Sequence, residues 1–154
     1  MSKYFFDTSA IVKRYHREDG SDIVDGLFAE PETKFIISDI SIIEFYSALS
    51  LKVRVGEIDE ENFASLRKLF SQEIKGGLYE IVEFTNAEKL EATKLLLKHA
   101  KTHSLKTLDA MQLSVIKAIN RPEIHAVVCA DEKLCKIITI EGFPVINPME
   151  GTLI

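Results

Sequence analysis

The chain has 154 residues, of which 46% are hydrophobic and 28% are charged, and its formal net charge is -5. This length and composition fit a single globular domain over residues 1–154 and exclude a disordered chain. With 24 Asp and Glu residues against 19 Lys and Arg, the charge argues against a protein that binds nucleic acid mainly through a broad basic surface. A nuclease whose acidic site is neutralised by metal ions stays open.

The sequence predicts neither export nor a membrane partner. Asp7 follows the first apolar residues before the h-region of a signal peptide can form, and no apolar run is long enough to cross a bilayer. Cys129 and Cys135 are too few for a disulfide framework or a zinc site, which favours two buried thiols in a reducing compartment. We therefore expect a cytoplasmic protein.

Apolar runs of strand length alternate with segments of helical periodicity along the chain. The predicted strands cover residues 3–6, 34–38, 79–84, 126–130 and 145–147. The predicted helices cover residues 21–29, 40–55, 59–74, 87–103, 108–120 and 132–141. Short, mostly apolar strands separated by helices are typical of a parallel sheet covered on both faces. We predict an α/β fold of three layers, α/β/α, around a central parallel sheet of about five strands.

Two predicted helices, 40–55 and 59–74, form an insertion longer than a simple crossover between strands needs. Such a helical pair suits a clamp over the sheet edge or an arm that binds a partner. The first helix is apolar on two sides, which are formed by Ile40, Ala48, Leu51 and Val55 and by Ile42, Phe45, Leu49 and Val53. A thick core and a homodimer both explain such a helix, and both interpretations remain open.

Four carboxylates lie where the surrounding sequence is apolar. Asp7 follows the first predicted strand and Asp131 the fourth, and ligands of parallel sheets bind beyond the carboxyl ends of the strands. Glu44 interrupts an apolar side of its helix, and no cationic residue at helical spacing can pair with it. Asp109 lies in the first turn of a helix, where the helix dipole favours negative charge.

Two interpretations of these acids remain open. Asp7 and Asp131 also suit N-caps at strand-to-helix turns, and Asp109 also suits an ordinary first-turn acid. If all four meet at one edge of the sheet, they repel one another and raise each other's pKa. A hard divalent cation, Mg²⁺ or Mn²⁺, as one or two ions, removes this repulsion and supports phosphodiester hydrolysis.

Around these acids the sequence resembles the PIN-domain family, and within it the VapC-like toxins of toxin–antitoxin pairs. Residues 7–15, DTSAIVKRY, are similar to the first motif of that branch, and residues 41–44, SIIE, to its second acidic site. Residues 107–113, TLDAMQL, resemble the third and most specific motif, and residues 130–134 and 142–148 resemble the family's ending. The resemblance follows nearly the whole chain in order, and all four acidic positions of the family carry acids here.

The resemblance implies a PIN-like fold and an endoribonuclease that cuts RNA with Mg²⁺ or Mn²⁺ held by Asp7, Glu44, Asp109 and Asp131. It also implies a cognate antitoxin protein as partner. Thr8 and Ser9 are candidates for hydroxyls that orient a ligand or contact substrate beside the metal. One departure is Cys129, which stands where the family often has Thr or Ser; this concerns residues around the metal more than its ligands.

Several basic residues are candidates for binding RNA phosphates. Arg14 is the best of them and Lys13 the next, because both follow Asp7 closely. Further candidates are Arg17, Lys52, Arg54, Lys133 and Lys136, and the alternative for each is an ordinary solvated side chain. His99 and His103 have the i,i+4 spacing of metal ligands, but with no third ligand evident a surface pair is favoured.

Other functions fit less well. No Gly-rich phosphate loop is present, a response-regulator receiver would have paired acids after the first strand, and a haloacid-dehalogenase-like phosphatase would have Asp in place of Ser9. Two alternatives within the family's range remain: a PIN-like module that binds RNA or protein without cutting, and a housekeeping RNA-processing nuclease.

Overall fold

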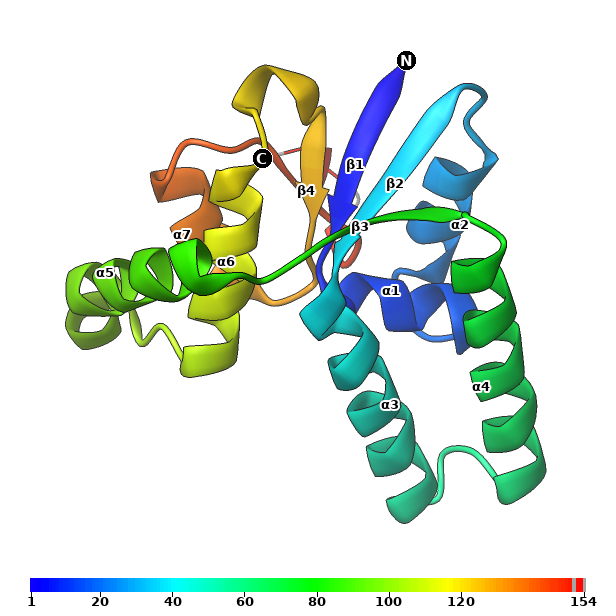
Figure 1. Ribbon diagram of the computed structural model, residues 1–154. Helices are drawn as coiled ribbons and strands as arrows, with labels where there is room; N and C mark the ends of the chain where they lie inside the picture. Colours follow the sequence, from blue (N-terminus) through cyan, green and yellow to red (C-terminus); the bar gives the residue numbers. More distant parts are fainter. Residues whose placement is uncertain (151, 154) are drawn as a thin grey trace.

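The protein is built on one six-stranded sheet, shown in a computed structural model (Figure 1) that describes residues 1–150 and the backbone of residues 152–153. The strand order is β3-β2-β1-β4-β5-β6. The strands are β1 (Ser2–Phe6), β2 (Thr33–Ser38), β3 (Tyr79–Val82), β4 (Ala126–Val128), β5 (Val145–Asn147) and β6 (Thr152–Leu153). β1 to β5 pair in parallel, as predicted, and β6 adds an antiparallel edge that was not predicted.

Seven α-helices surround this sheet in the described part of the chain. They are α1 (Thr8–Tyr15), α2 (Ser21–Ala29), α3 (Asp39–Arg54), α4 (Glu60–Lys75), α5 (Asn86–His103), α6 (Thr107–Ala118) and α7 (Glu132–Ile140). A 3₁₀ turn, η1 (Arg121–Glu123), precedes β4. No helix in the described residues is long and apolar enough to span a bilayer.

Each face of the sheet packs against its own set of helices, which confirms the predicted three layers. Side chains alternate along the strands, so Phe5, Ile36 and Val127 lie in the core under α5, α6 and α7. Their neighbours Phe6, Ile37 and Val128 lie in the core on the other face, together with residues of α1, α2, α3 and α4. Figure 1 shows the two groups of helices on either side of the strands. Strands buried on both faces explain the nearly continuous apolar runs of the sequence.

The helical pair α3–α4 is inserted between β2 and β3, as predicted, and extends beyond the sheet (Figure 1). One side of α3 is buried: the Phe45 ring lies 3.8 Å from that of Phe70 on α4 and 5.1 Å from that of Tyr15 on α1, measured between centroids. On the other predicted apolar side, Ile40 at the start of the helix is buried, but Leu51 and Val55 are 46% and 59% exposed. Beyond its first turn α3 is therefore buried on one side only within this chain, and the thick-core interpretation is wrong for that part.

The helix α1 was not predicted from the sequence. α1 begins directly after Asp7, whose side chain caps it, and has only 8 residues. Six of them are buried, so apolar residues face several directions and give no single stripe of helical periodicity. The ends of β3 and β4 were also predicted two residues too long, because apolar residues continue past the last strand hydrogen bonds.

Candidate functional site

The strand order places the ends of β1 and β4 at the point where the chain changes direction across the sheet. From β1 the chain builds β2 and β3 on one side, and β4 and β5 follow on the other. Phe6 and Val128 are paired in register, so Asp7 and Asp131 leave the sheet at the same edge. A crevice at such a switch point is the usual ligand site of open parallel sheets.

Asp7 and Asp131 each cap a helix with one oxygen atom. Oδ2 of Asp7 accepts hydrogen bonds from the backbone N–H of Ser9 at 3.1 Å and from its hydroxyl at 2.6 Å. Oδ1 of Asp131 accepts from the N–H of Leu134 at 3.0 Å, at the start of α7. In the described residues, the second carboxylate oxygen of each makes no protein hydrogen bond. The capping interpretation is correct, and it leaves one oxygen of each acid available to a ligand.

Among the residues that the structure describes, Glu44 also accepts hydrogen bonds at only one of its carboxylate oxygens, while Asp109 accepts none. Oε1 of Glu44 accepts from the side-chain amide of Gln112 at 2.6 Å and from the hydroxyl of Thr8 at 3.2 Å. Asp109, in the first turn of α6, accepts no hydrogen bond within the part of the chain that is described. Its carboxylate is therefore the least restrained of the four.

All four carboxylates line one pocket of about 670 Å³. They reach it from four elements, since Asp7 precedes α1, Glu44 lies on α3, Asp109 on α6, and Asp131 precedes α7. The exposed Arg54 is the one cationic side chain among the described residues of the lining. The remaining lining residues are Thr8, Ser9, Val12, Ile40, Ile43, Ser47, Ala48, Ser50, Leu51, Leu108 and Met111.

Burial and mutual repulsion raise the pKa of three of these acids. Burial raises the pKa of Asp7, which is 6% exposed, above its ordinary value, and the charge of Asp131 adds to the rise. Burial also raises the pKa of the half-buried Glu44, with a further contribution from Asp7. For Asp109, burial and then the charges of Asp7, Asp131 and Glu44 raise the pKa to about 6. Asp131 itself is exposed, although the sequence before it is apolar.

The residues of this pocket fit a hard divalent cation. The donors are carboxylate and hydroxyl oxygens, with no imidazole or exposed thiol among the lining residues. Within residues 1–150, no group of three or more His, Cys, Asp or Glu side chains lies close enough together to hold a metal ion directly. Mg²⁺ commonly keeps several water ligands and binds one or two carboxylates, so acids at this spacing suit an ion that reaches some of them through water.

The hydroxyl and thiol side chains that the sequence suggested beside the metal, Thr8, Ser9 and Cys129, contact different acids or backbone groups. Thr8 contacts Glu44, and the Ser9 hydroxyl also accepts from the N–H of Ala130 at 3.0 Å, which joins the ends of β1 and β4. The Cys129 thiol is buried and lies 3.9 Å from Oδ2 of Asp7, where the family often has a hydroxyl. Ser9, which lines the pocket, and the buried Cys129 therefore both contact Oδ2 of Asp7.

Lys13 and Arg14, the favoured RNA contacts of the sequence analysis, are engaged elsewhere. Lys13 is 7% exposed; its ammonium pairs with Glu18 at 3.2 Å and donates to the carbonyl of Asp19 at 2.7 Å. Arg14 pairs with Glu73 on α4 at 2.6 Å and lies 4.2 Å above the Phe28 ring. Neither residue lines the acidic pocket.

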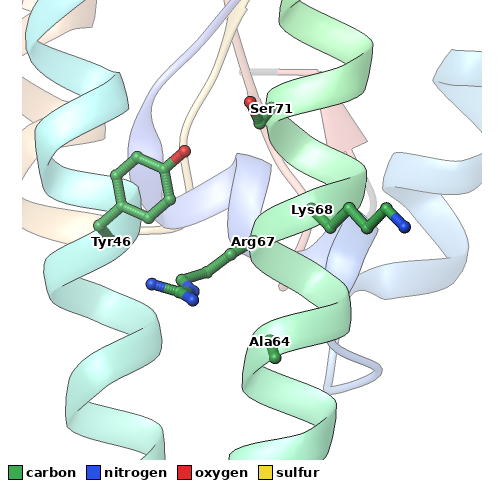
Figure 2. A pocket seen from close by; sticks show the side chains of 5 residues that line it. All are labelled: Tyr46, Ala64, Arg67, Lys68 and Ser71. Atoms are coloured by element: carbon green, nitrogen blue, oxygen red, sulfur yellow. The ribbon is translucent and has the colours of Figure 1, made fainter.

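Two further features lie away from the acids. His99 is 2% exposed and pairs with Glu141 at 2.9 Å. One member of the expected surface pair, His99 and His103, is therefore buried. A separate groove of about 420 Å³ runs between α3 and α4. In Figure 2, Tyr46 points from α3 toward α4 and Arg67 points from α4 toward α3, while Lys68 points away from α3 and Ala64 and Ser71 lie along α4.

One polar contact to the acids was not expected from the sequence. Gln112 is 1% exposed and donates to Glu44, although it lies within the apolar face of α6. The signal was present in residues 107–113, TLDAMQL, where a long polar side chain interrupts an apolar run, but its partner could be found only from the fold.

The raised pKa of Asp109 predicts that its charge destabilises the metal-free protein. Because its pKa is about 6 when folded against an ordinary 3.8, the native state holds the proton more tightly than the unfolded chain. Stability in EDTA should therefore fall as pH rises through that window. We expect Asp109→Asn to raise the free energy of unfolding at pH 7.5 by about 1–2 kcal/mol, discounted for solvent screening, in urea titrations.

The exposed Glu83→Gln is the matched control and should change the free energy of unfolding by less than about 0.5 kcal/mol. Millimolar Mn²⁺ should stabilise the wild type more than Asp109→Asn, since a ligand that binds only the native state stabilises it. A loss of stability for Asp109→Asn in EDTA would show that the acid is a structural residue.

The sequence matches the model of the PIN domain over residues 4–138. Among solved structures, similar folds include FitAcB from Neisseria gonorrhoeae, with TM-score 0.67 and 17% identity over 94% of this chain and 97% of that one. They also include VapC20 of Mycobacterium tuberculosis, a sarcin-ricin loop cleaving toxin, with TM-score 0.64 and 16% identity over 91% and 95%. A toxin–antitoxin complex from Klebsiella pneumoniae has TM-score 0.61 and 15% identity over 94% and 97%. Among curated protein sequences, no significant match was found. Because the family model spans most of the sequence, the chain belongs to the PIN-domain family.

Proposed function

We propose that this PIN-domain protein is a metal-dependent endoribonuclease that hydrolyses RNA phosphodiester bonds, and that it acts as the toxin of a toxin–antitoxin pair. The observation that carries the proposal is the shared pocket of Asp7, Glu44, Asp109 and Asp131, four acids from four separate elements. The resemblance of the surrounding motifs supports the same four residues as the acids of a PIN-like site. Stability alone gives no reason to gather four like charges, so a cationic ligand is the simplest explanation.

Asp7, Glu44, Asp109 and Asp131 would hold one or two Mg²⁺ or Mn²⁺ ions through oxygen atoms that make no protein hydrogen bond. When bound, such ions would offset the charge of the acids and the negative charge that develops on the phosphate during hydrolysis. The chain itself fixes the acids: Ser9 holds Asp7, the start of α7 holds Asp131, and α3 presents Glu44. Asp109, with its pKa raised to about 6, can hold a proton in the metal-free protein.

Arg54 replaces Lys13 and Arg14 as our proposed contact to an RNA phosphate. It is exposed, lines the acidic pocket, and makes no ion pair or hydrogen bond with another residue in the described part of the chain. It lies ten residues after Glu44 on α3, which places it about 15 Å further along the helix axis. That distance suits a phosphate a few nucleotides from the cleaved bond, held by the planar guanidinium.

An antitoxin protein is the proposed partner that restrains the nuclease. The support comes from similar structures: one is a toxin–antitoxin complex, and another is VapBC2 from Rickettsia felis bound to a promoter DNA fragment. The groove between α3 and α4 is a candidate place for it, because this helical pair projects from the sheet and has an open, partly basic lining (Figure 2).

Cleavage of a mixed RNA pool by the purified chain tests the nuclease directly. We expect cleavage with Mn²⁺ or Mg²⁺, none with EDTA, and a loss of at least about 100-fold for Asp7→Asn or Asp109→Asn, because each removes a ligand of the ion. Expression of the wild-type chain without a partner should slow growth of the host, and expression of Asp109→Asn should not.

Circular dichroism must show that both variants remain folded. If the wild type binds Mn²⁺ but cuts no RNA of the pool, a PIN-like module that binds without cutting becomes the better account. If it cuts RNA but its expression leaves growth unchanged, a housekeeping RNA-processing nuclease is favoured over a toxin.

The role of Arg54 is tested by RNA binding in the Asp109→Asn background. We expect Arg54→Gln to weaken binding of a short single-stranded RNA and to lower the salt slope of the affinity by about 0.7, the value for one phosphate contact on a single strand. Arg67→Gln on α4 is the matched control, since Arg67 is exposed but lies outside the acidic pocket. Equal effects of the two substitutions would refute a specific contact at Arg54.

A homodimer is also proposed, on the exposed apolar side chains of α3. Ile43, Leu51 and Val55 are 73%, 46% and 59% exposed, and Ile43 and Leu51 also line the acidic pocket. Light scattering should give a mass near twice 17.4 kDa for the wild type and near 17.4 kDa for Leu51→Glu. A monomeric wild type at micromolar concentration would contradict the homodimer. The exposed side of α3 would then be available only for binding RNA.

A further inference from the structure

Gln112 is a buried amide placed between the core of the protein and the acidic pocket. It lies on α6, three residues after Asp109, and is 1% exposed. A buried amide is costly unless its donors and acceptor find partners, so the position of each partner is informative. Every polar atom of this side chain has a partner in the structure.

The partners of Gln112 fix the orientation of its amide. Its Oε1 accepts a hydrogen bond from the hydroxyl of Ser38 at 2.8 Å. Its Nε2 donates to the hydroxyl of Ser41 at 2.8 Å and to Oε1 of Glu44 at 2.6 Å. Because an amide oxygen can only accept, the hydroxyl at Ser38 and the carboxylate at Glu44 define which end of the amide faces the pocket.

This amide restrains one oxygen of Glu44 and leaves the other without a protein partner. Both hydrogen bonds to Glu44, from Gln112 and from Thr8, go to Oε1. Without the bond from Gln112, only the longer bond from the Thr8 hydroxyl, at 3.2 Å against 2.6 Å, would restrain the half-buried carboxylate. The bond therefore decides which oxygen is presented to the pocket and where it lies.

We propose that Gln112 is a positioning residue that holds Glu44 in the orientation needed to bind a divalent cation in the acidic pocket. The inference rests on the proposed metal-dependent function. It adds a residue outside the pocket lining, and it assigns separate tasks to the two oxygens of Glu44. Oε1 is anchored by the amide, and Oε2 serves the ion.

The test is the affinity of the metal-free protein for Mn²⁺, measured by calorimetry at pH 7.5. Gln112→Met keeps the length of the side chain and removes its hydrogen bonds, and we expect Mn²⁺ to bind about 10- to 100-fold more weakly, as for other outer-shell partners of metal ligands. Leu113→Val is the matched control, because it removes a buried methylene from the same helix without touching Glu44. It should lower thermal stability and leave the Mn²⁺ affinity unchanged.

A double-mutant cycle with Glu44→Gln identifies the route of the effect. If Gln112 acts through Glu44, Gln112→Met should cost much less Mn²⁺ affinity in the Glu44→Gln background than in the wild type. Should Gln112→Met fail to fold, Gln112→Asn retains the amide one carbon further away and should give an intermediate loss of affinity. The kinetic counterpart is a fall in kcat at saturating RNA with little change in KM.

Two results would overturn the inference. An unchanged Mn²⁺ affinity in Gln112→Met or Gln112→Asn would show that the amide only stabilises the fold. An equal loss of affinity in the Glu44→Gln background would show that it acts elsewhere. A wild type that binds no Mn²⁺ would instead overturn the proposed metal-dependent function, and the inference with it, so the two failures are distinguishable.

Discussion

The arrangement of the pocket depends on repulsion among four carboxylates that the fold forces together. Three of them are stabilised by specific hydrogen bonds, each to one oxygen. Ser9 donates to Asp7, Gln112 to Glu44, and the start of α7 to Asp131. These bonds lower the cost of keeping charge at the sheet edge, but they leave the outer oxygens unpaired. Asp109 has no such bond, and burial together with the charges of the other three acids raises its pKa to about 6. A cation that binds here would be favoured because it relieves repulsion among the carboxylates that is already present in the fold.

The topology of the sheet explains why the acids meet. Because β1 is central and the chain changes direction between β1 and β4, the residues that follow these strands share one edge. The helices that start there bring in further groups: α3 starts after β2 and carries Glu44, and α6 packs against the opposite face and carries Asp109 and Gln112. The pocket therefore joins both layers of helices, and neither face of the sheet could form it alone.

Much of this could be predicted from sequence, for identifiable reasons. Strands buried on both faces leave apolar runs, and a carboxylate within an apolar face, such as Glu44, stands out because burial of a lone charge is costly. Asp7 fits both the N-cap and the metal-ligand interpretation, since one oxygen caps α1 and the other is left for the pocket. What could not be predicted depends on contacts distant in sequence. The Gln112–Glu44 bond joins residues 68 apart, and Arg14 was placed beside the acids by its sequence position although Glu73, 59 residues away, holds it elsewhere.

Anomalous scattering from a crystal soaked in Mn²⁺ would show whether these four acids bind a divalent cation. We expect one or two anomalous peaks in the pocket, within reach of Asp7, Glu44, Asp109 and Asp131 directly or through water. The same soak of Asp109→Asn should give a weaker peak. No peak at saturating Mn²⁺, or a peak confined to another site such as the His99 and His103 pair, would contradict the account.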